Sequence, residues 1–264
     1  MRRVLLGLLR CPRCRHGGLT PDVEGPELVF GPLRCLECQV SYPVSEGVVD
    51  LAVDRRPLSA AQRGWEHPLI ARSYERYLRP ALQLAVSRQR ADLAGELSRY
   101  RQLLGVPTGA ILDLGCGTGL IARKLAADPA LPPVVGMDLA SAMLAEAVAQ
   151  AREAGVAVDF LRAEAPGLPF KDHCLGAVLQ LGSLHQIGEA SGLFLEIARV
   201  LRPGGRYIAS SYLPPRPLTA GLHRRAGLFP RSGATLREEM TAAGLIAFEQ
   251  VQLPASVLVK AEKA

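Results

Sequence analysis

A glycine-rich turn, Asp113-Leu-Gly-Cys-Gly-Thr-Gly119, separates a short apolar run from a helical segment and most constrains what this chain can fold into. Residues 111–114 predict a buried strand, and residues 120–127 predict a helix. The glycines let the chain turn sharply and let a ligand approach the backbone closely. Ligands of open α/β sheets bind at the carboxyl ends of the strands. We therefore expect a ligand site at this turn.

From residue 110 onward, predicted strands and helices alternate. Further strands are expected at 134–138, 156–161, 175–181 and 206–211, and helices at 141–155, 193–201 and 235–243. Ser141 is expected to cap the first of these helices, and Gly155 to end it. Two last strands, 246–253 and 256–261, have almost no helix between them and should pair as a hairpin. The pattern predicts an α/β fold with a doubly wound, seven-stranded sheet and an antiparallel edge.

The N-terminal segment contains two C-x-x-C pairs, Cys11-Pro-Arg-Cys14 and Cys35-Leu-Glu-Cys38. Two such knuckles can complete a tetrahedral four-thiolate site, which has no open coordination position and is therefore structural. Disulfides are the alternative, but they are rare in proteins that are not secreted. We expect a zinc ribbon at residues 1–54, and because the segment has few apolar side chains we expect it to depend on the metal to fold.

The remaining chain divides into two parts. Residues 55–107 are rich in Arg, Leu and Ala and predict a helical linker that can cover a ligand as a lid. Residues 108–264 contain the alternating strands and helices and form the predicted main domain.

Composition and charge narrow the function little. Hydrophobic residues make up 48% of the 264 residues, which is ordinary for a globular protein, and the net charge is +6. An excess of Arg suits an anionic substrate or RNA, but it also suits a coding bias. No apolar run approaches the roughly 20 residues needed to span a bilayer, and the apolar start of the chain is followed by Arg10 and Cys11 instead of a cleavage site. We expect a cytoplasmic protein without membrane insertion.

The principal alternative for the glycine-rich turn is a dinucleotide-binding loop. That fingerprint spaces its glycines G-x-G-x-x-G, whereas this chain has Leu120 at the third glycine position and Gly119 one residue earlier. Asp138, at the end of the second predicted strand, can accept hydrogen bonds from both hydroxyls of a ribose. The carboxylate therefore indicates an adenosine ligand, and the glycine spacing disfavours a dinucleotide.

Together these motifs resemble the class I S-adenosylmethionine-dependent methyltransferases over residues 108–262. The resemblance rests on the glycine-rich turn, on Gly136-Met-Asp-Leu-Ala-Ser-Ala-Met-Leu144, on Phe160-Leu-Arg-Ala-Glu-Ala-Pro-Gly-Leu-Pro-Phe170 and on Arg199-Val-Leu-Arg-Pro-Gly-Gly-Arg206. It implies that Asp138 binds the ribose, that Leu139 packs on the adenine, and that Glu164 and the Ala165 amide face the adenine edge. The expected S-adenosylmethionine-binding residues are Asp113, Gly115, Cys116, Gly117, Gly119, Asp138, Leu139, Met143, Glu164, Ala165 and Gln180. Tyr74 and Tyr77 of the preceding helix either close over the cofactor or pack in the core. Cys116 is interpreted as a small residue and not as a nucleophile.

The N-terminal half extends the resemblance. A zinc ribbon, a helix with Tyr74-Glu-Arg-Tyr-Leu-Arg79 and this core are similar to uncharacterised bacterial and plastid methyltransferases, whose substrate is open. The arrangement is more distantly similar to ribosomal RNA guanine methyltransferases, which have a histidine as the fourth zinc ligand where this chain has Cys38.

The end of the fourth strand, Gln180-Leu-Gly-Ser-Leu-His185, should face the methyl group. It lacks the Asn/Asp-Pro-Pro-aromatic sequence of enzymes that methylate exocyclic base amines. His185 is the candidate catalytic base for a hydroxyl or an acidic carbon, and the alternative is that it caps a loop or contacts the cofactor. The segment His223-Arg-Arg225 can bind an anionic group or form a solvated loop.

Three functions remain open. The first is O- or C-methylation of a small phenolic, quinone-like or natural-product acceptor. The second is methylation of ribosomal or transfer RNA, with the zinc module gripping RNA, although stacking aromatics are scarce near the zinc knuckles. The third is a catalytically silent cofactor-binding scaffold subunit. The oligomeric state is not predicted.

Overall fold

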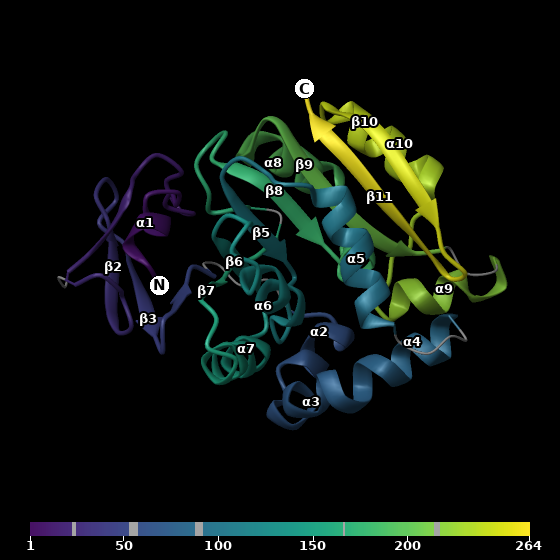
Figure 1. Ribbon diagram of the computed structural model, residues 1–264, viewed down its shortest axis with the longest axis horizontal. Coiled ribbons are helices and arrows are strands. Elements are labelled where there is room, and N and C mark those ends of the chain that lie inside the picture. The colour runs from purple at the N-terminus through teal and green to yellow at the C-terminus, as the bar shows by residue number, and fades with distance from the viewer. Residues whose placement is uncertain (23–24, 53–57, 88–91, 166, 214–216) are drawn as a thin grey trace.

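The computed structural model describes residues 1–22, 25–52, 58–87, 92–165, 167–213 and 217–264 (Figure 1). Within these residues, one sheet of eleven strands runs through the molecule in the order β1-β2-β3-β4-β7-β6-β5-β8-β9-β11-β10. The strands are β1 Leu19–Pro21, β2 Gly31–Cys35, β3 Ser41–Ser45, β4 Val48–Asp50, β5 Ala110–Leu114, β6 Val134–Asp138, β7 Val158–Arg162, β8 Leu175–Gln180, β9 Leu201–Tyr212, β10 Leu245–Gln252 and β11 Ser256–Lys263.

The predicted doubly wound core is confirmed, but the sheet is larger than the seven strands expected. Strands β7, β6, β5, β8 and β9 pair in parallel, and β11 and β10 add the predicted antiparallel hairpin at one edge. At the other edge, β4 pairs in parallel with β7, so that Val48, Val49 and Asp50 lie opposite Phe160, Leu161 and Arg162. The four N-terminal strands therefore continue the main sheet, which raises its strand number to eleven.

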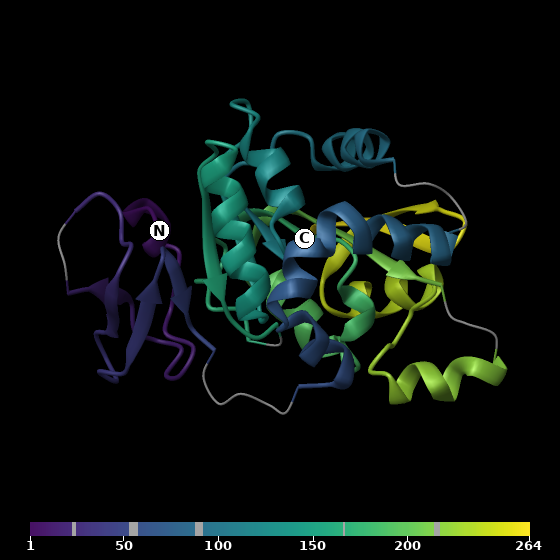
Figure 2. The same cartoon turned by 90° about the horizontal axis from the view of Figure 1, so that it is seen from below.

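Helices cover both faces of the central strands (Figures 1 and 2). Apolar residues of α5, α6 and α7 pack on one face with Ile111, Val134 and Phe160, while α8 and α10 pack on the other with Leu112 and Val135. The helical elements are α1 Arg3–Leu6, α2 Ala60–Trp65, α3 Pro68–Ser73, the π-helical turn η1 Tyr74–Leu78, α4 Arg79–Ser87, α5 Leu93–Leu104, α6 Leu120–Ala126, α7 Ser141–Glu153, the 3-10 turn η2 Leu184–Gln186, α8 Ser191–Val200, α9 Pro217–Arg225 and α10 Gly233–Ala242.

The N-terminal segment shares the core of the main sheet. Leu5, Leu9 and Leu33 are buried in the same apolar cluster as Phe170, and Leu9 forms an isolated bridge with Phe170. The segment thus has more apolar support than its own composition suggested. The predicted boundary at residue 54 lies outside the described residues, and the boundary at 107 lies between α5 and β5.

The cap of α7 differs from the prediction. The helix begins at Ser141, but the Ser141 side chain forms no cap. Instead Glu66, just after α2, accepts hydrogen bonds from the Ser141 backbone N–H at 2.9 Å and from its hydroxyl at 2.7 Å. A carboxylate at a helix N-terminus satisfies free N–H groups and complements the helix dipole. Residues 60–66 are thereby attached to the main domain.

Among the described residues, no helix combines the length and apolar character needed to cross a membrane.

Candidate active site

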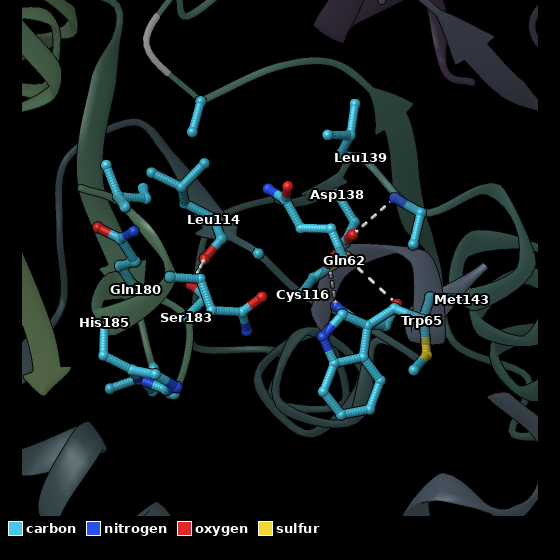
Figure 3. Close-up of a pocket in the computed structure, with 18 of the residues that line it drawn as sticks. Gln62, Trp65, Leu114, Cys116, Asp138, Leu139, Met143, Gln180, Ser183 and His185 are labelled. Atoms are coloured by element: carbon cyan, nitrogen blue, oxygen red, sulfur yellow. Dashed lines mark hydrogen bonds between the residues drawn. The ribbon is translucent and has the colours of Figure 1, made fainter. Parts of the chain in front are cut away.

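A cavity of about 910 Å³ lies at the carboxyl ends of β5, β6 and β8 (Figure 3). The loops after these strands line it, together with residues of α2, η1 and α4. Ligand pockets typically measure roughly 300–1,000 Å³. The cavity lies at the edge of the sheet where the sequence predicted a ligand site.

The glycine-rich turn forms the floor of this cavity. Gly115, Gly117 and Gly119 all have left-handed backbone conformations, with φ of 72°, 54° and 74°. A Cβ atom on Gly115 would lie 2.3 Å from the Ser183 Oγ, whereas one on Gly117 would meet nothing within 4 Å. Only glycine fits both the conformation and the contact at position 115. The backbone at Gly117 is left open to a ligand.

Two carboxylates hold this turn in place. Asp138 accepts hydrogen bonds from the Gly117 N–H at 2.8 Å and from the Ala140 N–H at 2.9 Å. Asp113 accepts from the Ala122 N–H at 3.1 Å, at the start of α6. Burial raises the pKa of Asp138 above its ordinary value, and it raises the pKa of Asp113 to about 7. The predicted acidic residues are therefore brought together beneath and beside the cavity.

The wall expected to contact adenine is also assembled. Leu139, Met143, Glu164 and Ala165 all line the cavity. Cys116 lines it as well, and burial raises the pKa of its thiol well above the ordinary value, first of all by desolvation. A neutral, half-buried thiol agrees with the interpretation of Cys116 as a small residue.

The lid residues divide between the cavity and solvent. Tyr74 lines the cavity, and its ring meets Trp65 edge-on with centroids 5.6 Å apart. Tyr77 is 62% exposed, is not among the residues lining the cavity, and has the Arg76 guanidinium over its ring. The structure therefore places Tyr74, but not Tyr77, where the sequence expected both.

Sequence reasoning missed six cavity residues of the predicted lid, namely Leu58, Gln62, Trp65, Glu66, Arg79 and Leu82. Gln62, Trp65 and Glu66 line the cavity from α2 and the residue after it, and Figure 3 shows Gln62 and Trp65 together with Asp138 and Met143. The one signal available was the single tryptophan of the chain, next to an acidic residue. Its position relative to β6 depends on packing between distant segments.

The end of β8 brings Gln180 and His185 to the cavity. Gln180 is buried, and its Oε1 accepts a hydrogen bond from the Tyr207 hydroxyl at 2.6 Å. His185 lies in η2 with its ring against Tyr212, at a centroid distance of 4.3 Å. Desolvation lowers the pKa of His185 to about 4, so the imidazole is neutral near pH 7.

A group of apolar residues also lines the cavity. These residues are Leu82 of α4, Ile187 after β8, Leu213, Leu228 and Pro230 after β9, and Pro254 between β10 and β11. Arg79 and His223 add basic groups to this lining. His223 is thus the member of the His223–Arg225 segment that reaches the cavity.

Two of the five buried side-chain polar atoms without a hydrogen-bond partner among the described residues belong to residues of the cavity. The Nε1 of Trp65 and the Nδ1 of His185 are buried without a hydrogen-bond partner, and both residues line the cavity. Buried polar groups are normally paired, so such exceptions point to a missing partner. Acidic acceptors at one end and an open glycine backbone suit a ligand with ribose hydroxyls and a positive charge, such as S-adenosylmethionine.

The four predicted metal-binding cysteines form one cluster. Their sulfur atoms all lie within 4.8 Å of one another, with Cys11 and Cys38 at 3.7 Å and Cys14 and Cys35 at 3.6 Å. All four are free thiols. Four sulfur donors in one compact group are the donor set that zinc prefers in structural sites. None of these cysteines lines the cavity.

Comparison with known proteins agrees with this geometry. Residues 111–205 match the methyltransferase domain family. Over these residues the chain is similar to methyltransferase domains. The match begins in β5 and ends within β9.

Relatives and solved structures extend this comparison. A ubiquinone/menaquinone biosynthesis C-methyltransferase of Syntrophotalea carbinolica is 32% identical over 56% of this chain and 63% of its own length. An uncharacterized chloroplastic methyltransferase of Arabidopsis thaliana is 24% identical over 81% of this chain and 64% of its own. The chain therefore spans less than two thirds of both relatives. The structure of Haemonchus contortus phosphoethanolamine N-methyltransferase 2 with S-adenosyl-L-methionine is 18% identical, covers 65% of this chain and 52% of that one, and shares the fold with a TM-score of 0.58.

Proposed function

We propose that this chain is an S-adenosylmethionine-dependent methyltransferase whose acceptor is a small, largely apolar ring compound of phenolic or quinone-like character, methylated on oxygen or carbon. The observation that carries the proposal is that one cavity joins a glycine-bounded, acidic end to an apolar end. The acidic end suits the cofactor. The apolar end suits an acceptor with few charges.

The residues of the acidic end would hold the cofactor. Asp138 would receive the ribose hydroxyls, Leu139 and Met143 would enclose the adenine, and Glu164 with the Ala165 amide would face its polar edge. When bound, S-adenosylmethionine supplies an activated methyl group on a sulfonium, which a nucleophilic acceptor atom takes in an in-line displacement. For such a displacement, orientation supplies much of the rate. Gln180, fixed by Tyr207, would help to set that orientation.

In this proposal His185 orients the methylated compound by accepting a hydrogen bond from it. It does not act as a strong base. Its pKa is lowered to about 4 by burial, whereas a phenol has an ordinary pKa of about 10. A neutral imidazole can accept a hydrogen bond from the hydroxyl group of the methylated compound, and this bond increases the negative charge on the hydroxyl oxygen. The stacked ring of Tyr212 fixes the plane of the imidazole.

The relatives support this acceptor class. The Syntrophotalea relative is named as a C-methyltransferase of ubiquinone/menaquinone biosynthesis, and its similarity covers just over half of this chain. The apolar lining from Leu82, Ile187 and Leu213 is chemically suited to a substituted ring. No described feature favours RNA to the same degree.

The four cysteines would hold a structural zinc ion. The sulfur atoms have no substrate-facing position because none of these cysteines lines the cavity. We further propose that residues 1–54, 55–107 and 108–264 act as zinc ribbon, lid and catalytic domain, and that the protein works in the cytoplasm.

A labelled methyl-transfer assay tests the function. The full chain is mixed with methyl-labelled S-adenosylmethionine and, in separate reactions, a demethylated naphthohydroquinone, simple phenols and total RNA. Binding of S-adenosylhomocysteine is measured in parallel by thermal shift. We expect a thermal shift and label in a ring compound.

Each other outcome has a defined meaning. Label in RNA alone would replace the acceptor class by nucleic acid. Binding of S-adenosylhomocysteine without transfer to any acceptor would favour the scaffold alternative. Absence of both binding and transfer would overturn the methyltransferase proposal.

A further inference from the structure

Arg162, at the carboxyl end of β7, joins three separate parts of the molecule. Its side chain is only 9% exposed. The Nε donates to the Leu139 carbonyl at 2.9 Å, the Nη1 to Asp50 Oδ2 at 3.0 Å, and the Nη2 to Glu66 Oε1 at 3.4 Å. A planar guanidinium can hold several acceptors at once in a fixed arrangement.

The three residues that accept hydrogen bonds from Arg162 belong to three different segments. Asp50 is the last residue of β4, the strand that joins the cysteine-containing segment to the main sheet, and it lies directly opposite Arg162 in the register. Leu139 follows Asp138, which also lies opposite Arg162 on the neighbouring strand β6. Glu66 belongs to the lid and caps α7 with its other oxygen. Arg162 thus connects the zinc module, the loop after β6 and the predicted lid.

The contact with Leu139 bears directly on the cofactor loop. The Ala140 N–H, one residue further on, is held by the Asp138 carboxylate at 2.9 Å. Fixing the Leu139 carbonyl and the Ala140 amide determines the orientation of the peptide between them, because that unit is planar. Leu139 and Asp138 line the cavity as neighbours along this backbone.

The position of the Arg162 guanidinium depends on the carboxylates of Asp50 and Glu66, which lie in other segments. A buried cation is strongly destabilising when its partner is removed, because the remaining charge is left unpaired. Asp50 and Glu66 compensate Arg162 from opposite segments. If one carboxylate is neutralised, the guanidinium is held less firmly and the Leu139 contact weakens.

We propose that Arg162 is a positioning residue for the adenosine end of the cavity, and that the zinc module contributes to cofactor binding as a fixed support through Asp50. This inference rests on the proposed binding of S-adenosylmethionine. It assigns the N-terminal module a role inside the chain, in place of RNA or partner binding.

Affinity for S-adenosylhomocysteine, measured by calorimetry on the full chain, tests the inference. Asp50→Asn keeps the shape of the side chain but removes its charge, and Arg162→Lys keeps the charge but removes the fork. We expect the dissociation constant to rise by about tenfold in Arg162→Lys and several-fold in Asp50→Asn, as for the loss of a charge-assisted hydrogen bond.

Arg199→Lys is the matched control. Arg199 is also largely buried, pairs with Asp172 and Glu196, and donates to the carbonyls of Phe170 and Leu168, but it does not line the cavity. It should lower the melting temperature without changing the dissociation constant. A purely structural role for Arg162 would give the same result in all three variants.

The outcomes separate this inference from the function on which it rests. If the unmodified chain fails to bind S-adenosylhomocysteine, the proposed function is overturned. If the unmodified chain binds and both Asp50→Asn and Arg162→Lys bind equally well, the positioning role is overturned. If Arg162→Lys does not fold, Asp50→Asn decides, since its side chain is 27% exposed and its amide can still accept from the Ala52 N–H.

Discussion

The imidazole of His185 lies against the phenol ring of Tyr212, with ring centroids 4.3 Å apart and ring planes inclined by 37°. His185 comes from the turn after β8, and Tyr212 ends β9, so the pair closes the carboxyl edge of the sheet between two neighbouring strands. The histidine is buried, and its Nδ1 has no partner among the described residues. Its titration should therefore differ clearly from that of an exposed histidine.

His185→Gln should reduce the loss of stability at low pH. The folded pKa of about 4 lies below the ordinary 6.5, so the unfolded chain binds the extra proton first and stability falls as pH drops from 6.5 to 4. The wild type should lose roughly 3 kcal/mol from this group over that window. Urea unfolding of both proteins at pH 7 and pH 4.5 measures the difference. In the exposed control His173→Asn, the loss of stability between pH 7 and pH 4.5 should equal that of the wild type. If His185→Gln loses as much stability as the wild type over this range, His185 is not the group responsible.

Asp113→Asn should reduce the loss of stability at high pH. Burial raises the folded pKa of Asp113 to about 7, so the folded protein binds the extra proton and stability falls as pH rises from 4 to 7. The amide avoids a buried charge and can still accept from the Ala122 N–H. The unliganded variant should therefore gain stability relative to wild type at pH 8 but not at pH 4. Parallel thermal melts at the two pH values check this, and a uniform destabilisation would refute it.

Gly115→Ala should damage the cofactor turn through one contact. The added Cβ would lie 2.3 Å from the Ser183 Oγ, whereas Gly155, with a similar φ of 64°, has nothing within 4 Å. Both substitutions carry the strain of a left-handed alanine, and only Gly115→Ala adds a clash. We expect the affinity for S-adenosylhomocysteine, measured by calorimetry, to fall by at least about tenfold in Gly115→Ala and to stay unchanged in Gly155→Ala. Adding Ser183→Gly should restore part of it, and failure of this rescue would point to backbone strain as the sole cause.

Glu75→Gln should loosen the lid. Glu75 in η1 accepts from Arg123 Nη2 at 2.9 Å and from the Thr118 hydroxyl at 2.5 Å, and Arg123 also donates to the Thr118 carbonyl. Removing the charge leaves a largely buried arginine short of its partner, which should cost about 2 kcal/mol. Limited proteolysis within residues 58–87 should become faster. The exposed pair of Glu46 and Arg152 supplies the control, since Glu46→Gln should change neither readout.

Local chemistry made part of the site predictable. The glycine spacing, the acid at the end of β6 and the two C-x-x-C pairs each require particular residues at short separations, and the structure brings them together as clusters. The conformational demands on Gly115 and Gly117 are visible in sequence because no other residue meets them at low cost.

The remainder depends on long-range packing. The pairing of Val48–Asp50 with Phe160–Arg162 joins strands more than a hundred residues apart, and a parallel strand pair has no turn signal. Tyr74 and Tyr77 would share a face in an α-helix, but they lie in the π-helical turn η1, which rotates Tyr77 toward solvent. The sequence showed the helix but not the change in its pitch.

Gly17→Ala should impair zinc binding without removing a ligand. A Cβ at position 17 would lie 2.3 Å from the Cys35 Sγ, whereas one at the adjacent Gly18 would approach only Leu36 Cδ1 at 3.9 Å. Tetrahedral zinc tolerates little displacement of its sulfur ligands, so we expect one zinc ion per chain in wild type and Gly18→Ala and less in Gly17→Ala. Metal analysis after purification measures this, and a chelator-induced fall in melting temperature should follow the zinc content because the module shares the main core. Full zinc occupancy in Gly17→Ala, or disulfides in place of metal in the wild type, would refute the four-thiolate site.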